Sequence, residues 1–232
     1  MQAVILAAGR GTRMGDLTND RPKPMLEVAG KTLLQHKFDA LPAGIDEIIL
    51  VVGYLADVIK NAYGDSYAGK PIRYVTQENI VGGTADALWQ AKDLLRGKFL
   101  VINGDDIYAR EDFEALLAYD WAILIQRVAE TKGAGKVISD AENKVIDIIE
   151  SSDHDGGEGC VNTSTFALDT RIFDYPQVAK ATGSTEMGLP QTIIAASNAG
   201  DIPLYCVETT RWIQITNSED IQRAAKEIEK TV

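Results

Sequence analysis

Short apolar runs alternate with segments of helical pattern along the first half of the chain. The predicted strands span residues 3–8, 47–52, 72–76 and 99–102. The predicted helices span residues 32–41, 55–63, 84–95 and 111–118. Strands that read as continuous apolar runs are typical of a sheet covered on both faces. The alternation therefore predicts an α/β fold with a mainly parallel sheet and helices on both sides.

The second half changes character, because its predicted strands follow one another with short turns between them. They span residues 122–128, 134–139, 145–150 and 161–168, with a later strand at 202–207. Helices are predicted over residues 185–199 and 218–230, the second capped by Asn217 or Ser218. This pattern predicts a small antiparallel extension. No linker separates the halves, so we expect one domain over residues 1–232.

The composition is that of a globular protein with an acidic balance. The 232 residues include 23 Lys and Arg against 34 Asp and Glu, a formal net charge of −11, and 45% are hydrophobic. No apolar run approaches the roughly 20 residues of a membrane span, and the run 3–8 is too short for a signal peptide. Cys160 and Cys206 form neither a disulfide framework nor a CxxC motif, so we expect a cytoplasmic protein.

Positive charge gathers in one segment of this acidic chain. An acidic balance argues against a nucleic-acid partner, which normally requires a basic patch. Between Gly9 and Pro24, however, four basic residues stand against two acids. The basic residues are Arg10, Arg13, Arg21 and Lys23. A basic loop on an acidic protein predicts a small polyanionic ligand.

The basic segment begins as a glycine loop that directly follows the first predicted strand. Open α/β sheets bind ligands at the carboxyl ends of their strands. Gly9 and Gly11 let backbone N–H groups approach an anion, while Arg13 and Lys23 supply charge to phosphate oxygens. The spacing GxGxxxG matches neither the Walker A pattern nor the dinucleotide fingerprint. A tight surface turn with solvated charges is the alternative interpretation of these residues.

The longer sequence around this loop resembles the signature of the sugar-phosphate nucleotidylyltransferases. The resemblance rests on residues 6–14 (LAAGRGTRM), Leu17-Thr18 and residues 22–26 (PKPML). It implies a Rossmann-like three-layer sandwich, with residues 1–120 as the nucleotide-binding half and 121–232 as the sugar-binding half. It also implies that Arg13, Lys23 and Asp105 are catalytic. The implied nucleotide-binding residues are Leu6, Ala8, Gly9, Gly11, Thr12, Arg13, Gln77, Gly83, Thr84 and Asp105.

A second segment resembles the part of the family that binds the base. Residues 77–88 (QENIVGGTADAL) are similar to the family's Gln…Gly-Thr-Ala-x-Ala-Leu, with one extra residue before Gly-Thr. By that resemblance the amide of Gln77 pairs with a pyrimidine edge, and Gly83 and Thr84 line the base pocket. An amide donates and accepts at once, as uracil and thymine require, so UTP or dTTP is the expected donor. Thr84 is also expected to cap its helix.

Residues 101–106 (VINGDD) end a predicted strand at the same sheet edge and carry the expected metal site. Asp105 matches the metal-binding aspartate of the family, and Mg²⁺, or alternatively Mn²⁺, is the expected cofactor. We expect Asp106 to face away or to cap the residues from Ile107. In residues 212–216 (WIQIT), Gln214 stands where the family has a second metal-binding aspartate.

The sugar-binding residues implied by the resemblance are spread along the chain. They are Asn103, Gly135, Glu150, Asn162 and Glu186. Relatives have Glu-Lys-Pro where this chain has Glu150-Ser151-Ser152, so the lysine that grips the sugar phosphate is replaced by Ser151. Lys136 or Lys144 is a candidate substitute.

The expected function is metal-dependent transfer of a nucleotidyl group from a nucleoside triphosphate to a sugar 1-phosphate. The partners are these two small molecules, with no nucleic acid and no membrane, and a homo-oligomer is compatible with the resemblance. No catalytic His is needed, since the sugar phosphate is already an oxyanion. Ser151 and Gln214 motivate an alternative, a binding module of the same fold without turnover. A CTP-dependent phosphocholine-type cytidylyltransferase is a second alternative. We expect no appended β-helix, because the sequence lacks hexapeptide periodicity.

Overall fold

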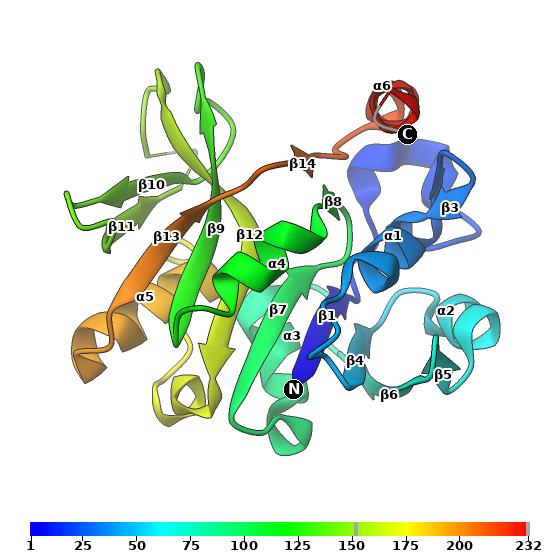
Figure 1. Ribbon diagram of the computed structural model, residues 1–232, viewed down its shortest axis with the longest axis horizontal. Helices are drawn as coiled ribbons and strands as arrows, with labels where there is room; N and C mark the ends of the chain where they lie inside the picture. The colour runs from blue at the N-terminus through cyan, green and yellow to red at the C-terminus, as the bar shows by residue number, and fades with distance from the viewer. Residues whose placement is uncertain (151–152, 231–232) are drawn as a thin grey trace.

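Short strands connected by helices make up the chain, which the computed structural model describes for residues 1–150 and 153–230 (Figure 1). The longer strands are β1 (Gln2–Ala7), β4 (Glu47–Val52), β6 (Lys70–Thr76), β7 (Lys98–Asn103), β9 (Trp121–Val128), β10 (Lys136–Ser139), β11 (Val145–Ile149), β12 (Gly159–Asp169) and β13 (Leu204–Glu208). The two-residue strands are β2 (Glu27–Val28), β3 (Lys31–Thr32), β5 (Ser66–Tyr67), β8 (Ile107–Tyr108) and β14 (Trp212–Ile213).

The helices are of two kinds. The α-helices are α1 (Leu33–Ala40), α2 (Ala56–Tyr63), α3 (Gly83–Gln90), α4 (Arg110–Leu116), α5 (Leu189–Gly200) and α6 (Ser218–Glu229). The 3₁₀ helices are η1 (Thr12–Thr18), η2 (Lys23–Met25), η3 (Lys92–Leu94) and η4 (Thr170–Asp174). None of the helices within residues 1–150 and 153–230 is long and apolar enough to cross a lipid bilayer.

The centre of the sheet is parallel. β1 pairs in parallel with both β4 and β7, and β4 pairs in parallel with β6. Every residue of β1 and β4 is buried, as expected for apolar strands covered on both faces. The registers place Leu6 opposite Val51 on one side and Asn103 on the other. The carboxyl ends of these strands therefore meet at one edge of the sheet.

An antiparallel part continues the same sheet through β12. β12 pairs antiparallel with β9 along most of its length, and its other edge pairs antiparallel with β10 at the beginning and with β7 at the end. A register shift in the β9 pairing lies between Asn162 and Phe166, where the other edge passes from β10 to β7, and Ser164 there has a φ of 60°. The predicted mainly parallel sheet with an antiparallel extension is confirmed.

Helices cover both faces of the sheet, which confirms the three-layer sandwich (Figure 1). On one face, Leu88 of α3 and Ile193 of α5 pack in a single apolar cluster with Leu6 and Val101 of the strands. On the other face, Phe38 of α1 packs in a second cluster that also takes in residues of α2 and α4. α3 lies behind the sheet in Figure 1 and α4 lies in front of it.

A third apolar cluster joins the end of the chain to its beginning. Ile213, Ile215 and Ala224 are buried with Met14 and Leu26 of the segment after β1. α6 starts with a capping box, in which Asn217 accepts from the Asp220 backbone and Asp220 accepts from the Asn217 backbone. The last helix is thereby held over the N-terminal loop.

Two predicted helices differ from the observed ones. The helix predicted over 185–199 begins at Leu189, because Met187 forms a β-bridge with Ala179 and Gly188 is extended. Pro190 then occupies the first turn, where its missing N–H costs nothing. The helix predicted over 84–95 is divided into α3 and η3, which meet at Ala91.

Candidate active site

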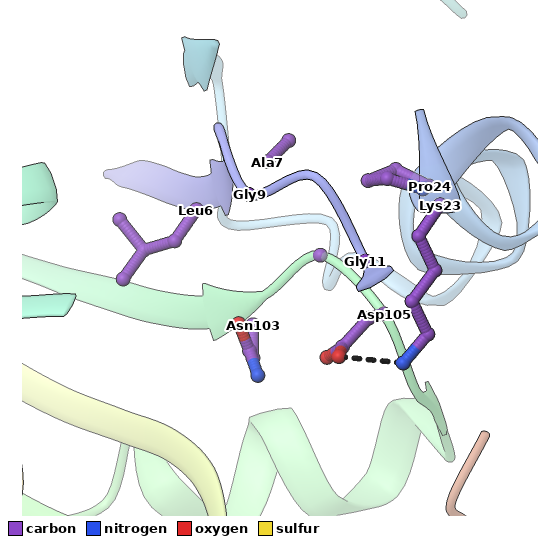
Figure 2. Close-up of a pocket in the computed structure, with 9 residues that line it drawn as sticks. Leu6, Ala7, Gly9, Gly11, Lys23, Pro24, Asn103 and Asp105 are labelled. Carbon is purple, nitrogen blue, oxygen red and sulfur yellow. Dashed lines mark hydrogen bonds and ion pairs between the residues drawn. The ribbon is translucent and has the colours of Figure 1, made fainter. Parts of the chain in front are cut away.

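Three adjoining cavities lie at the carboxyl ends of β1 and β7, and Leu6 and Asn103 line all three. The first, which we call the loop cavity, has a volume of about 80 Å³ (Figure 2). It is lined by Leu6, Ala7, Gly9, Gly11, Lys23, Pro24, Asn103, Gly104 and Asp105. The structure thus brings the predicted glycine loop, Lys23 and Asp105 together at the edge that the sheet topology selects.

Lys23 and Asp105 form a largely buried ion pair in the loop cavity (Figure 2). The Lys23 ammonium donates to Asp105 Oδ2 over 2.7 Å and also to the backbone carbonyl of Ile215. Gly11, with a φ of 69°, leaves room for this lysine, since a Cβ there would lie 2.7 Å from Lys23 Cβ. The loop conformation and the lysine position therefore depend on each other.

The second cavity, the amide cavity, has a volume of about 190 Å³. It is lined by Leu6, Ala8, Gly9, Gln77, Ile80, Gly83, Thr84, Ala87, Asn103 and Glu186. The amide nitrogen of buried Gln77 donates to the Gly83 carbonyl over 3.0 Å and to Asp86 Oδ2 over 2.7 Å. Both amide hydrogens are thus engaged, which leaves the Gln77 side chain with its oxygen as the acceptor for a ligand.

A close backbone contact forms one wall of the amide cavity. The Met187 N–H donates to the Gly82 carbonyl over 2.7 Å, and the Ala85 N–H donates to the Met187 carbonyl over 3.0 Å. Gly83 has a φ of 95°, and a Cβ there would lie 2.2 Å from the Met187 carbonyl oxygen. This contact carries Glu186, predicted to bind sugar, into the amide cavity.

We expected Thr84 to cap its own helix, but it does not. The residue that precedes α3 is Gly82, which has no side chain, and Thr84 lies in the first turn. The Thr84 hydroxyl instead accepts from the N–H of Leu189, the first residue of α5, over 3.0 Å. An N–H that lacks an intrahelical partner is thereby satisfied from a helix about a hundred residues earlier in the sequence.

The third cavity is small and lies toward the antiparallel part of the sheet. Its lining is Leu6, Thr84, Asn103, Ser164, Phe166, Leu189 and Pro190. Gly135 and Asn162 are neighbours, since the Asn162 N–H donates to the Gly135 carbonyl over 2.9 Å. Glu150 accepts from the Gln191 side chain of α5 over 2.6 Å. The lining does not include Gly135, Glu150 or Asn162. Ser151, which stands where relatives have lysine, lies outside the described residues.

The basic side chains of the N-terminal loop do not converge on one point. Arg10 stacks over the ring of Tyr54 at 5.4 Å, and Arg21 pairs with Asp20. Thr12 and Arg13 are exposed and line none of these three cavities. Lys23 is buried and already paired. Among the described residues, Arg10 and Arg13 are both exposed and neither forms an ion pair; Arg10 is engaged by the Tyr54 ring.

Asp106 is buried and contacts the C-terminal segment. It lines none of the three cavities, in agreement with the expectation that it faces away, and its side-chain hydrogen bonds go to Trp212 and Ile215 rather than to a cap at Ile107. Its Oδ2 accepts from the indole N–H of Trp212, and its Oδ1 accepts from the Ile215 N–H, each over 3.0 Å. Burial first, and then the nearby charge of Asp105, raises the pKa of Asp106 to about 7. The sequence offered no signal for this contact, because the partners lie over a hundred residues away.

Lys37 is a buried cation that the motif comparison missed. Its ammonium donates to the Leu33 carbonyl over 3.2 Å and to the backbone carbonyl of Asp106. Burial lowers its pKa to about 8, against the opposing attraction of Asp105 and Asp106. A signal was present in the sequence, since Lys37 follows Leu33 and Leu34 at helical spacing and so lies on the buried face of α1.

The donor set of the loop cavity fits a hard cation such as Mg²⁺. Asp105 Oδ1 is buried and has no hydrogen-bond partner, so it is available as a ligand. Residues 1–150 and 153–230 hold no cluster of three or more His, Cys, Asp or Glu side chains that could bind a metal. Gln214 is exposed and does not line the loop cavity. An ion that takes most of its ligands from water and phosphate, as Mg²⁺ does, suits such a site.

The fold and this edge define the class of protein: an α/β protein whose candidate ligand site is built from a glycine loop, a lysine and an aspartate. Residues 2–231 match the family model described as nucleotidyl transferase. The chain belongs to this family, the sugar-phosphate nucleotidyltransferases, which confirms the resemblance seen in the sequence.

Curated relatives agree with the family. The bifunctional protein GlmU of Methanocaldococcus jannaschii is 33% identical over 193 residues, which cover 83% of this chain and 46% of that protein. The UTP–glucose-1-phosphate uridylyltransferase AglF of Haloferax volcanii is 32% identical over 206 residues, covering 83% of this chain and 82% of that protein. The chain spans less than half the length of the GlmU relatives it matches.

Solved structures share the fold over nearly the whole chain. HddC from Yersinia pseudotuberculosis has a TM-score of 0.74 at 26% identity, covering 98% of this chain and 99% of that one. The inositol-1-phosphate CTP transferase from T. maritima has a TM-score of 0.78 at 20% identity, covering 100% and 97%, and is a likeness of fold alone.

Proposed function

We propose that the protein transfers a nucleotidyl group from a nucleoside triphosphate to a sugar 1-phosphate and releases pyrophosphate. The observation that carries this proposal is the Lys23–Asp105 pair in the loop cavity, beside Gly9 and Gly11. A cation, an available carboxylate oxygen and glycine backbone meet there at the carboxyl ends of parallel strands. This arrangement is suited to a triphosphate, whose transfer chemistry depends mainly on positioning and charge stabilisation.

The proposed reaction is an in-line displacement at the α-phosphorus. An oxygen of the sugar phosphate forms the new P–O bond as the bond to the bridging oxygen breaks, and pyrophosphate leaves with that electron pair. The Lys23 ammonium stabilises the charge that develops on the phosphate oxygens. Arg13, an exposed residue of the N-terminal loop, supplies a guanidinium that can grip the departing pyrophosphate. No side chain has to remove a proton, because the nucleophile is already an anion.

We assign the metal dependence to Asp105. Bound Mg²⁺, or Mn²⁺, would draw charge from the phosphate oxygens. The unpartnered Oδ1 of Asp105 is the protein ligand that supports this assignment. Gln214 is the second candidate, because it adjoins Ile215, whose carbonyl accepts from Lys23. Its amide oxygen is a weaker ligand than a carboxylate.

UTP or dTTP is the donor we propose. The oxygen that remains to Gln77 requires a donor from the base, and N3–H of uracil or thymine is such a donor. The corresponding ring nitrogens of cytosine and adenine are acceptors, so these bases offer Gln77 no ring N–H and would have to donate from their exocyclic amino groups instead. AglF, a relative over most of both chains, is a UTP-dependent uridylyltransferase by name. Guanine also carries a ring N–H, so GTP is the competitor to test.

The acceptor sugar is proposed to lie toward the third cavity. Asn103 lines all three cavities, and Glu186 lines the amide cavity. Gly135, Asn162 and Glu150 lie on the antiparallel side, where they can contact sugar hydroxyls once the acceptor is bound. Lys144 pairs with Glu142 at the surface, so Lys136 is the better candidate for the sugar phosphate.

The test is pyrophosphate release over a matrix of substrates with Mg²⁺ or Mn²⁺. The donors are ATP, CTP, GTP, UTP and dTTP, and the acceptors are glucose 1-phosphate, mannose 1-phosphate, inositol 1-phosphate and phosphocholine. We expect release with UTP or dTTP and a sugar 1-phosphate, and a loss of about 100-fold or more in kcat for Lys23→Met. Asp105→Asn should require more metal for half-maximal rate.

Other outcomes would select the alternatives. Release with CTP and phosphocholine alone would favour the cytidylyltransferase. Tight nucleotide binding without release in any combination would favour a binding module. In the metal arm, Gln214→Asp should lower the Mg²⁺ concentration needed for half-maximal rate, whereas an unchanged requirement removes Gln214 from the proposed ligand set.

A further inference from the structure

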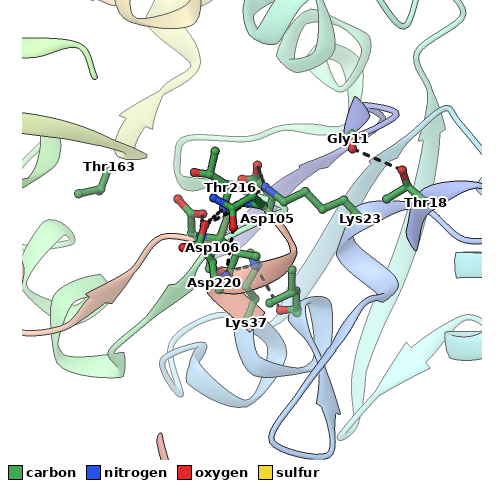
Figure 3. A network of polar contacts seen from close by, with 12 residues as sticks. Gly11, Thr18, Lys23, Lys37, Asp105, Asp106, Thr163, Thr216 and Asp220 are labelled. Atoms are coloured by element: carbon green, nitrogen blue, oxygen red, sulfur yellow. Dashed lines mark hydrogen bonds and ion pairs between the residues drawn. The ribbon is translucent and has the colours of Figure 1, made fainter. Parts of the chain in front are cut away.

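A closed ring of polar contacts joins the proposed catalytic pair to the C-terminal segment (Figure 3). Asp105 accepts from Lys23, and Lys23 donates to the Ile215 carbonyl. The N–H of the same Ile215 donates to Asp106, the residue after Asp105. Two consecutive aspartates therefore hold one residue of the C-terminal segment, Asp105 through Lys23 and Asp106 directly.

The second oxygen of Asp106 fixes the start of this segment. It accepts from the indole N–H of Trp212, whose backbone pairs with Tyr108 in the small β8–β14 sheet. Asp106 is 6% exposed, so neither of its oxygens has water as a ready substitute for these donors. The residue is thus bound at both oxygens to partners on one short stretch, Trp212 and Ile215.

Contacts from two other elements complete the support around the ring. The Lys37 ammonium, from α1, donates to the backbone carbonyl of Asp106. Asp220 of α6 accepts from the backbone N–H groups of Thr216 and Asn217 over 2.7 and 3.0 Å. Residues 212–217 are therefore held on both sides of Ile215, and its carbonyl is presented to Lys23 in one direction.

This geometry bears on how Lys23 is aimed. An ammonium on a flexible stem takes its direction from its acceptors. With a single carboxylate partner it would follow Asp105 alone, whereas the Ile215 carbonyl adds a second fixed point. If that carbonyl moved, the ammonium would turn away from the loop cavity or bind Asp105 more fully.

We propose that Asp106 is a positioning residue, which orients Lys23 for the transferred phosphate by holding residues 212–215 in place. The proposal rests on the proposed function, since it assigns Lys23 to the reacting phosphates. Asparagine at position 106 has one acceptor oxygen in place of two. Its NH2 group would face the N–H of either Trp212 or Ile215, so one of the two hydrogen bonds is lost. Asp106→Asn therefore breaks the ring while preserving the size of the side chain.

The structure offers a matched control in Asp112. Asp112 is also buried, at 1% exposure, and its carboxylate accepts from the Thr209 hydroxyl and from the Thr210 N–H and hydroxyl. It holds Thr209 and Thr210, which lie a few residues before Trp212, but it contacts neither Lys23 nor Asp105. Asp112→Asn thus reports the general cost of losing a buried aspartate clamp.

The experiment compares wild type, Asp106→Asn, Trp212→Phe and Asp112→Asn by steady-state kinetics and by amide hydrogen exchange of the unliganded proteins. For Asp106→Asn we expect kcat to fall about 10–100-fold, KM for the nucleotide to change less than about threefold, and exchange to accelerate over residues 212–216. Trp212→Phe removes one donor alone and should show the same pattern, more weakly. Asp112→Asn should accelerate exchange near Thr209 and keep kcat within about twofold.

The proposal is overturned if Asp106→Asn keeps the wild-type kcat, or if Asp112→Asn loses as much kcat as Asp106→Asn. If Asp106→Asn does not fold, Trp212→Phe decides alone, and a wild-type kcat together with faster exchange refutes the positioning role. If wild type itself releases no pyrophosphate, the proposed function fails. The hold of Asp106 on residues 212–215 is then judged by hydrogen exchange alone: unchanged exchange over residues 212–216 in Asp106→Asn overturns it, and faster exchange there but not in Asp112→Asn supports it.

Discussion

The amide of Gln77 shows how a neighbouring side chain can decide what a site accepts. Asp86 Oδ2 and the Gly83 carbonyl both require a donor, so the Gln77 amide nitrogen must face them. The motif comparison identified Gln77 and placed it correctly in a cavity beside Gly83 and Thr84. It assumed, however, that the amide could both donate and accept. The orientation comes from Asp86, which occupies the position that the family motif leaves variable.

Removing Asp86 should relax the choice of base. In Asp86→Ala one amide hydrogen of Gln77 is released, and the amide can turn to present a donor to cytosine. We expect the ratio of kcat/KM for UTP over CTP to fall about tenfold, equivalent to about 1.4 kcal/mol, the size of one hydrogen bond. Gln90→Ala is the control, because Gln90 donates to the other oxygen of Asp86. A ratio that Asp86→Ala leaves unchanged would contradict this account of Gln77.

At the scale of elements, the decisive contact is the one between the start of α3 and residues 185–188. It brings the second half of the chain against the first half, and it depends on Gly83 lacking a side chain. The same contact moves the start of α5 to Leu189. It also places the Leu189 N–H where it donates to the Thr84 hydroxyl. One close backbone approach therefore accounts for the late start of α5 and for the failure of Thr84 to cap α3.

Gly83→Ala should destabilise the protein more than an equally left-handed glycine in open space. The new methyl group would meet the Met187 carbonyl, and alanine would have to adopt a φ of 95°. We therefore expect a loss of about 2–5 kcal/mol in the free energy of unfolding. Gly97→Ala is the control, since Gly97 has a φ of 55° with nothing within 4 Å of its added Cβ. It should lose about 1–2 kcal/mol. Urea unfolding measures both losses. Equal losses in the free energy of unfolding would show that the Met187 backbone moves away from the new methyl group without cost.

The elements that could be predicted are those whose own residues determine them. β4 has the predicted bounds because six consecutive buried residues mark a strand covered on both faces. β8 and β14 could not be predicted, since two-residue strands have no periodicity and form only when distant segments meet. The partners of Asp106 could not be predicted for the same reason, since they depend on where the C-terminal segment crosses, which no local pattern records. Lys37 could have been found from helical spacing, had buried charge been considered.

For the molecule as a whole, the net charge of −11 hides a more specific distribution. Lys23 and Lys37 are buried near Asp105 and Asp106, so two cations and two carboxylates occupy the interior beside the loop cavity. Of the four basic residues counted in the N-terminal loop, Lys23 is the one that reaches this interior. The count pointed to the segment whose Gly9, Gly11 and Lys23 line the loop cavity, but burial determines which of its charges lies there.

The stability of the whole molecule should respond to His36 at mildly acidic pH. Burial first, and then Lys37 and Lys31, lowers its pKa, against the opposing effects of its bond to the Val28 carbonyl and of Asp39. Below the unfolded-state value near 6.5, the unfolded chain binds the proton more readily, so the free energy of unfolding falls as pH falls. His36→Gln should therefore flatten this fall between pH 7 and 5.5 in urea titrations. Parallel curves for the two proteins would assign the pH dependence to other groups.

The ring at Ile215 has a consequence for the order of events during synthesis. Lys23 and Ile215 are 192 residues apart, so the lysine emerges long before the carbonyl that directs it. At about 5–20 residues per second, the ribosome adds the intervening chain in about 10–40 s. Throughout that interval the sheet edge and the glycine loop can assemble, yet the lysine has no second acceptor. The Lys23 contact is thus completed only after Ile215 has been translated and its segment has docked on the sheet edge.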